Sequence, residues 1–107
     1  MLNQVMLVGR IITLEKEENQ EIKKANIKIA VNRKYKNADG IYDTDFIKVI
    51  IWDTIATNVS EYCKKGDLIG IRGRLRQGVE NEDLELVAEK VTFLSTKKEN
   101  DNESEEN

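Results

Sequence analysis

Apolar side chains recur at every second position through much of this chain, and that period restricts its fold more than any other feature. Residues 25–31 alternate, with Ile27, Ile29 and Val31 on one face and small or polar residues between them. This period is typical of β-strands, in which successive side chains point to opposite faces. Segments rich in apolar and β-branched residues also occur at 5–12, 44–52, 67–76 and 84–94. The sequence therefore predicts five strands.

One helix is expected between the third and fourth strands. Asp53 or Thr54 can cap its first amides. The side chains expected to face the core recur at helical spacing: Ile55, Val59, Tyr62 and Cys63. Gly66 follows two lysines and is expected to stop the helix in a left-handed conformation.

The connections complete the predicted topology. A solvated loop is expected at 15–21, a tight hairpin turn at Asp39-Gly40 and another turn at 78–83. Three strands, one helix and two strands match the OB-fold, an all-β, five-stranded Greek-key barrel with its helix between strands three and four. A generic α+β domain is the alternative that the pattern alone leaves open.

The charge is unevenly distributed along the 107 residues. The net charge is −3, but residues 99–107 contain five acidic residues and no basic one. The preceding residues hold 17 basic and 15 acidic side chains, so residues 1–98 carry about +2. We expect one domain over 1–98, followed by a disordered acidic tail at 99–107 that has no apolar residue.

Several function classes lack support in the sequence. The chain has no histidine and one cysteine, so neither a usual zinc site nor a histidine acid–base shuttle is available. Cys63 lies on the apolar helix face and is expected to be an inert thiol. We therefore expect no enzyme activity, no cofactor, no metal and no small-molecule substrate. Without a membrane-length apolar run or a signal peptide, the expected location is cytoplasmic, with no membrane partner.

The third strand carries the first candidate binding residues. Its period puts Ile47, Val49 and Ile51 in the interior, and an outward set that mixes aromatic and basic residues: Phe46, Lys48, Ile50 and Trp52. Aromatic rings can stack on bases of any sequence, and a lysine beside them can neutralise a phosphate. Alternatively, the aromatic side chains cover a partner subunit or a minor cluster, with Lys48 extending between them.

Basic residues add further candidates. The fourth strand places Ile69, Ile71, Gly73 and Leu75 inward and Arg72, Arg74 and Arg76 outward as a linear positive track. An ordinary solvated face is the alternative, although three like charges in a row repel one another. The hairpin adds the basic and aromatic run Arg33, Lys34, Tyr35 and Lys36, and Arg10 is a weaker candidate.

These segments also resemble the bacterial single-stranded DNA-binding protein family. The resemblance covers about residues 1–95, and five segments follow the family's order: 1–11, 26–33, 45–52, 59–67 and 73–76. It implies an OB-fold, usually a homotetramer, that binds single-stranded DNA without sequence preference in replication, repair and recombination. It also implies that Tyr35, Phe46 and Trp52 are the stacking aromatics, and that bound protein lies at the nucleoid. For the oligomeric state, a dimer is the second expectation after the homotetramer.

Three departures accompany the resemblance. The hairpin that begins at Gln77 is short and lacks the aromatic residue usual in the family, and the tail lacks the terminal proline and phenylalanine that dock repair proteins. These differences favour an accessory or mobile-element member. Two alternative functions stay open: a primosome-type OB protein that uses Phe46 and Trp52 as protein anchors, and an RNA-binding OB module.

Overall fold

Five strands and one helix follow one another in the predicted order. The computed structural model describes residues 1–18, 23–78 and 82–96, and the expected tail lies outside them. The elements are β1 (Val5–Glu18), β2 (Lys23–Lys36), β3 (Tyr42–Trp52), α1 (Asp53–Tyr62), β4 (Leu68–Gln77) and β5 (Leu84–Ser95).

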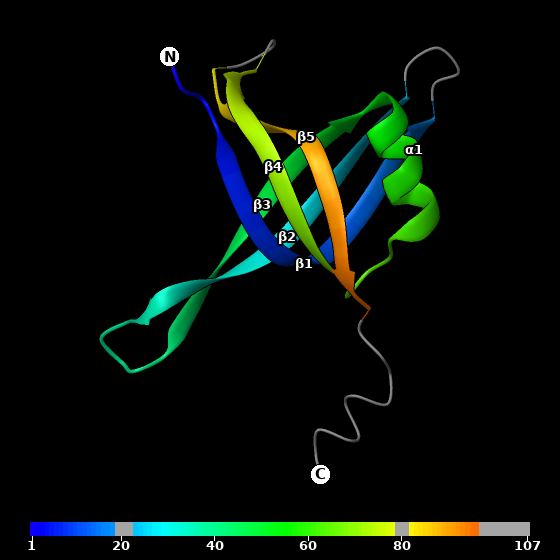
Figure 1. Ribbon diagram of the computed structural model, residues 1–107. Helices are drawn as coiled ribbons and strands as arrows, with labels where there is room; N and C mark the ends of the chain where they lie inside the picture. Colours follow the sequence, from blue (N-terminus) through cyan, green and yellow to red (C-terminus); the bar gives the residue numbers. More distant parts are fainter. Residues whose placement is uncertain (19–22, 79–81, 97–107) are drawn as a thin grey trace.

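The strands close into a barrel in the order β1-β2-β3-β5-β4 (Figure 1). All neighbouring pairs are antiparallel except β3 and β5, which run parallel. Closure depends on β1, which pairs with β4 through Val5–Arg10 and with β2 through Arg10–Glu18. The pairing with β2 is irregular between Ile11 and Thr13, at the place where the strand changes partners. The all-β, OB-type prediction is confirmed.

The interior of the barrel is filled by the inward set of each strand. Buried apolar residues come from all five strands and from α1: Ile11, Ala25, Ile27, Ile29, Val49, Ile51, Ala56, Val59, Ile69, Ile71, Leu86 and Ala88. Val31 and Ile47 are partly buried against this cluster. The inward faces predicted for residues 27–31 and 47–51 are therefore confirmed.

The connections differ from the sequence prediction in two places. Most of the loop expected at 15–21 is strand, because β1 continues to Glu18 and β2 begins at Lys23; residues 19–22 lie outside the described ranges. The hairpin strands likewise extend to Lys36 and from Tyr42. They form an arm that projects from the barrel on the side away from α1 (Figure 1).

The helix predictions need three corrections. Neither Asp53 nor Thr54 caps α1: Trp52 occupies the cap position without a side-chain hydrogen bond, and Asp53 has a φ of +55°. Gly66 has the predicted positive φ, but α1 ends earlier, at Tyr62. The reason is that the Lys64 amide donates to the Asp67 carboxylate and the Gly66 amide to the Ile11 carbonyl, forming the turn into β4. Tyr62, expected in the core, is 73% exposed, because the short helix buries only a narrow stripe around Ala56 and Val59.

One inward prediction for β4 is also wrong. Leu75 is exposed, whereas Ile69, Ile71 and Gly73 are buried as expected. Leu75 lies beyond the irregularity between Arg72 and Gly73 in the pairing with β5. There its backbone carbonyl and amide are both hydrogen bonded by the side-chain amide of Asn3, at 2.7 and 2.9 Å.

Cys63 packs against the barrel core at the end of α1. Burial raises the pKa of its thiol, and the nearby Asp67 raises that pKa further. Because a thiolate is the reactive form of cysteine, this environment disfavours reaction at Cys63.

Candidate nucleic-acid interface

The outer face of β2 and β3 is a ladder of cross-strand pairs. Their register places Lys24 opposite Trp52, Asn26 opposite Ile50, Lys28 opposite Lys48, and Ala30 opposite Phe46. Residues directly opposite one another in an antiparallel pair have Cβ atoms about 4.5–5.5 Å apart. The ladder therefore brings two aromatic rings, three lysines and an amide onto one surface.

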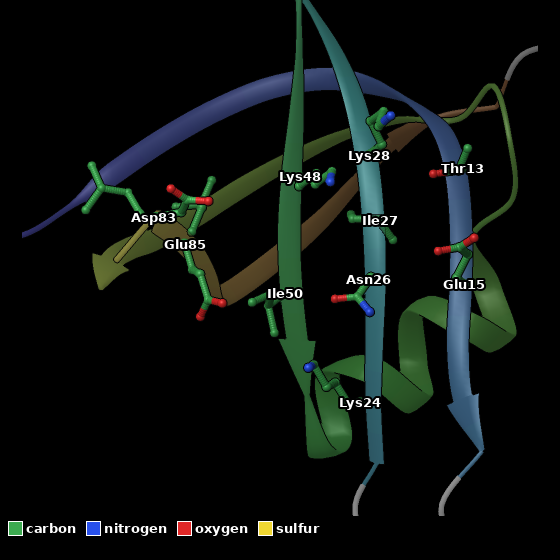
Figure 2. A pocket seen from close by; sticks show the side chains of 12 residues that line it. Thr13, Glu15, Lys24, Asn26, Ile27, Lys28, Lys48, Ile50, Asp83 and Glu85 are labelled. Carbon is green, nitrogen blue, oxygen red and sulfur yellow. The ribbon is translucent and has the colours of Figure 1, made fainter. Parts of the chain in front are cut away.

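A groove of about 670 Å³ runs over this ladder (Figure 2). Lysines of β2 and β3 occupy its middle, and acidic side chains lie at its sides, Glu15 on β1 and Asp83 and Glu85 near the start of β5 (Figure 2). The remaining lining residues are Thr13, Asn26, Ile27, Ile50, Leu84 and Leu86.

Lys28 and Lys48 form a like-charged pair in the middle of the groove. Like charges directly opposite one another destabilise a sheet. Within the described ranges, neither ammonium group has an ion pair or hydrogen bond with a carboxylate. The pair therefore forms a site that favours an anion. Sequence reasoning identified Lys48 but not Lys28, although it placed Lys28 on the outward face of its strand; the register with β3 was the missing information.

The two aromatic residues of β3 differ in exposure. The Phe46 side chain is 60% exposed, and the small Ala30 stands opposite it. Trp52 is half-buried, and two cations lie over its ring: Lys24 Nζ at 5.2 Å from the ring centroid and Arg76 Cζ at 6.0 Å. The predicted outward facing of both rings is confirmed, and Lys24 is a further residue that the sequence analysis missed.

The arginines of β4 point outward as predicted, but two of them form ion pairs and do not present free positive charge. Arg74 pairs with Glu89 at 3.6 Å and Arg76 with Glu85 at 3.1 Å, both across to β5. The predicted row of like charges is therefore partly neutralised, because acidic residues lie on the neighbouring strand. Arg72 is exposed and lines a separate groove with Met6, Val8 and Lys90, so the structure does not bring it together with the lysines of β2 and β3.

The arm carries the basic and aromatic run of the hairpin. Tyr35 is 81% exposed, and Lys34 is also exposed. Lys36 lies over the ring of Tyr42, with its Nζ 5.7 Å from the centroid. The arm turns at Asn37, whose side-chain oxygen accepts hydrogen bonds from the amides of Asp39 and Ile41, and Gly40 has a φ of +79°.

Arg33 is engaged within the arm. Its guanidinium donates to both carboxylate oxygens of Asp45, with a shortest distance of 3.0 Å, and Asp43 lies 3.9 Å away. The hydrogen bond with Asp45 raises the pKa of Arg33, and in turn Arg33 lowers the pKa of Asp45. Arg10, the weaker candidate, donates to the Gly66 carbonyl at 2.9 Å.

Within residues 1–18, 23–78 and 82–96, no group of three or more histidine, cysteine or acidic side chains lies close enough together to hold a metal ion. In the same part of the chain, no helix is both long and apolar enough to cross a membrane.

Comparisons with known proteins agree on one family. The sequence profile of the single-strand binding protein family matches residues 2–94. The "Single-stranded DNA-binding protein 1" of Clostridium acetobutylicum is 38% identical, over 92% of this chain and 98% of the relative. The "Single-stranded DNA-binding protein B" of Bacillus subtilis is 37% identical, over 91% of this chain and 94% of the relative.

Solved structures share the fold. A Plasmodium falciparum SSB in complex with single-stranded DNA superimposes with a TM-score of 0.72 at 22% identity, over 89% of this chain and 96% of that one. The small single-stranded DNA-binding protein of Streptomyces coelicolor gives a TM-score of 0.67 at 21% identity, over 88% and 95%.

Proposed function

The chain belongs to the single-strand binding protein family, and from this premise we propose that it binds single-stranded DNA without sequence preference. Stacking on aromatic rings supplies affinity for any base, and lysines neutralise the phosphates between stacked bases. The activity is binding, not catalysis, and it serves replication, recombination or repair. We place it in the bacterial cytoplasm, at the nucleoid when DNA is bound.

The observation that carries this proposal is the Lys28–Lys48 pair. It lies between Phe46 and Trp52 on one sheet face, and no carboxylate among the described residues neutralises it. A backbone phosphate at this pair would have an aromatic ring on either side along β3. Lys24 and Asn26 line the same groove. The arm would add Tyr35, Lys34 and Lys36 as further contacts.

The arginines have secondary roles in this proposal. Arg74 and Arg76 can reach phosphate only in competition with Glu89 and Glu85, and Arg33 only in competition with Asp45. Arg10 and Arg72 lie outside the groove, so their contacts would require a path of DNA that continues around the barrel.

Binding to three nucleic acids tests the proposed function. The affinities of the full chain for labelled oligo(dT), a single-stranded RNA of equal length and duplex DNA are measured at two salt concentrations. We expect oligo(dT) to bind most tightly, with an affinity that falls as salt rises, because counterions are released from phosphates. Preference for RNA would support the RNA-binding alternative. No binding to any of the three would leave the primosome-type alternative, which acts through protein partners.

We further propose that the chain forms a homo-oligomer, a tetramer first and a dimer second. The supporting observation is an apolar surface on β1, β4 and β5, where Met6, Val8 and Leu94 are exposed around Gly70. Exposed apolar patches of this kind mark interaction sites.

Sedimentation equilibrium of the wild type and of Val8→Asp tests this assembly. Val8 is exposed, so the substitution should leave the barrel folded while placing a charge in the interface. We expect a smaller species for the variant. An unchanged mass would remove this surface from the interface, and a monomeric wild type would overturn the oligomer itself.

A further inference from the structure

We propose that Glu85 is a positioning residue that holds Arg76 against Trp52, so that the stacking ring carries a displaceable cationic cover. The inference rests on the proposed binding of single-stranded DNA and adds a residue that limits the affinity of this binding. While Glu85 retains Arg76, a base that stacks on Trp52 must displace this cation, and Arg76 is withheld from the DNA backbone.

The geometry links four strands at one point. Arg76 on β4 and Glu85 on β5 are direct cross-strand partners, and their Nε–Oε1 distance is 3.1 Å. From there the guanidinium extends to the ring of Trp52 on β3, with its central carbon 6.0 Å from the ring centroid. Lys24 on β2 lies over the same ring at 5.2 Å. The Arg76 and Glu85 side chains are only 32% and 30% exposed, so solvent screens their pairing less than it screens fully exposed charges.

Arginine suits this position because its planar guanidinium can bond a carboxylate through its edge and lie against an aromatic ring with its face. A base approaching Trp52 competes for the same π-surface that attracts the cation. Glu85 also lines the lysine groove, where its negative charge repels a phosphate. Both effects make Glu85 limit the affinity of the site rather than contribute to it.

The chain provides a matched control for this proposal. Arg74 and Glu89 form a second arginine–glutamate pair between the same two strands, at 3.6 Å. Among the ring contacts of the described residues, none involves Arg74, and Glu89 does not line the groove. Glu89→Gln therefore makes the same change in net charge and releases the same kind of partner, away from the ring.

The experiment compares Glu85→Gln, Glu89→Gln and Arg76→Gln in the full chain. Trp52 is the only tryptophan, so its emission in the DNA-free protein reports on the cover directly. Affinity for labelled oligo(dT) is measured separately by anisotropy over a salt series, and thermal melts confirm that each variant folds.

We expect the emission of DNA-free Glu85→Gln and Arg76→Gln to change and that of Glu89→Gln to match the wild type. Glu85→Gln should bind oligo(dT) several-fold more tightly at low salt. The slope of log affinity against log salt concentration should be steeper by about 0.7, the value for one additional phosphate contact. Arg76→Gln should not steepen the slope, because no cation is released.

Two results would overturn the proposal. One is emission that is unchanged in Glu85→Gln. The other is equal affinity and slope in Glu85→Gln and Glu89→Gln, which would reduce the effect of Glu85 to general charge. If the wild type binds no oligo(dT), the proposed function fails, while the emission of the DNA-free variants still decides whether Glu85 positions Arg76.

Discussion

Phe46 offers the most open aromatic surface of the groove face. With 60% of its side chain exposed and Ala30 opposite it, its ring contributes little to the core. We expect Phe46→Ala to weaken oligo(dT) binding by ~1–3 kcal/mol, the range for one stacked base, with an unchanged melting temperature. Tyr62→Ala is the matched control, because this residue is also an exposed aromatic, at 73%, but lies on α1. Equal affinities for the two variants would exclude Phe46 from the site.

Asp45 and Arg33 give a pH-dependent prediction for the arm. Because Arg33 lowers the pKa of Asp45, the ion pair is fully formed above the ordinary aspartate pKa of about 3.9. Its stabilising effect on the arm is lost as pH falls through the lowered pKa. A carboxyl NMR titration should show the Asp45 pKa below the ordinary value in the wild type and closer to it in Arg33→Ala. Identical titrations would contradict the pairing.

The facing of most strand residues was predictable, with Leu75 as an exception, but the partners of these residues were not. A period of two is a local property, so it correctly placed Phe46 outward and Val49 and Ile51 inward. Whether a cation is paired depends on the register of the neighbouring strand. Glu85 and Glu89 are far enough from the β4 arginines in sequence that only the β4–β5 register brings them together. For the same reason, the sequence did not reveal that Lys28 lies opposite Lys48.

At the scale of elements, the close approach of β4 and β5 depends on Gly73. A Cβ atom at this position would lie 2.3 Å from the Val87 carbonyl oxygen, a backbone atom that cannot rotate away. We expect Gly73→Ala to lower the free energy of unfolding by ~1–3 kcal/mol, the usual cost of overpacking. Gly70→Ala is the control on the same strand, because its nearest neighbour would be a leucine methyl at 3.8 Å. Equal melting temperatures for the two variants would contradict this account of the strand contact.

The order of the elements could be read from the sequence, but not all of their ends. The succession of strands along the chain and the position of α1 between the third and fourth strands followed from apolar periods and were confirmed. The extensions of β1 to Glu18 and of β2 from Lys23 lack apolar alternation in the sequence, and the two segments pair with each other as antiparallel strands. The end of α1 was mispredicted for a similar reason. It is fixed by contacts of Lys64 and Gly66 with Asp67 and Ile11, and one of those partners is distant in sequence.

The whole barrel presents two surfaces with opposite character. The groove over β2 and β3 contains three lysines, and Phe46 and Trp52 lie on the same sheet face, whereas the surface over β1, β4 and β5 exposes Met6 and Val8. Each surface holds one like-charged cross-strand pair, Lys28–Lys48 in the groove and Arg72–Lys90 on the apolar surface. In our proposal, DNA binds to the first surface and self-association uses the second.

The most direct test of this assignment compares two double variants that remove equal charge. Lys28→Gln/Lys48→Gln and Arg72→Gln/Lys90→Gln are titrated with labelled oligo(dT) over a salt series. Removing the groove pair should weaken binding and make the slope shallower by about 1.4, the value for two phosphate contacts to a single strand. The second variant should keep the wild-type slope. A wild-type slope in the groove variant, together with a shallower slope in the Arg72–Lys90 variant, would contradict the account and place the DNA on the other surface.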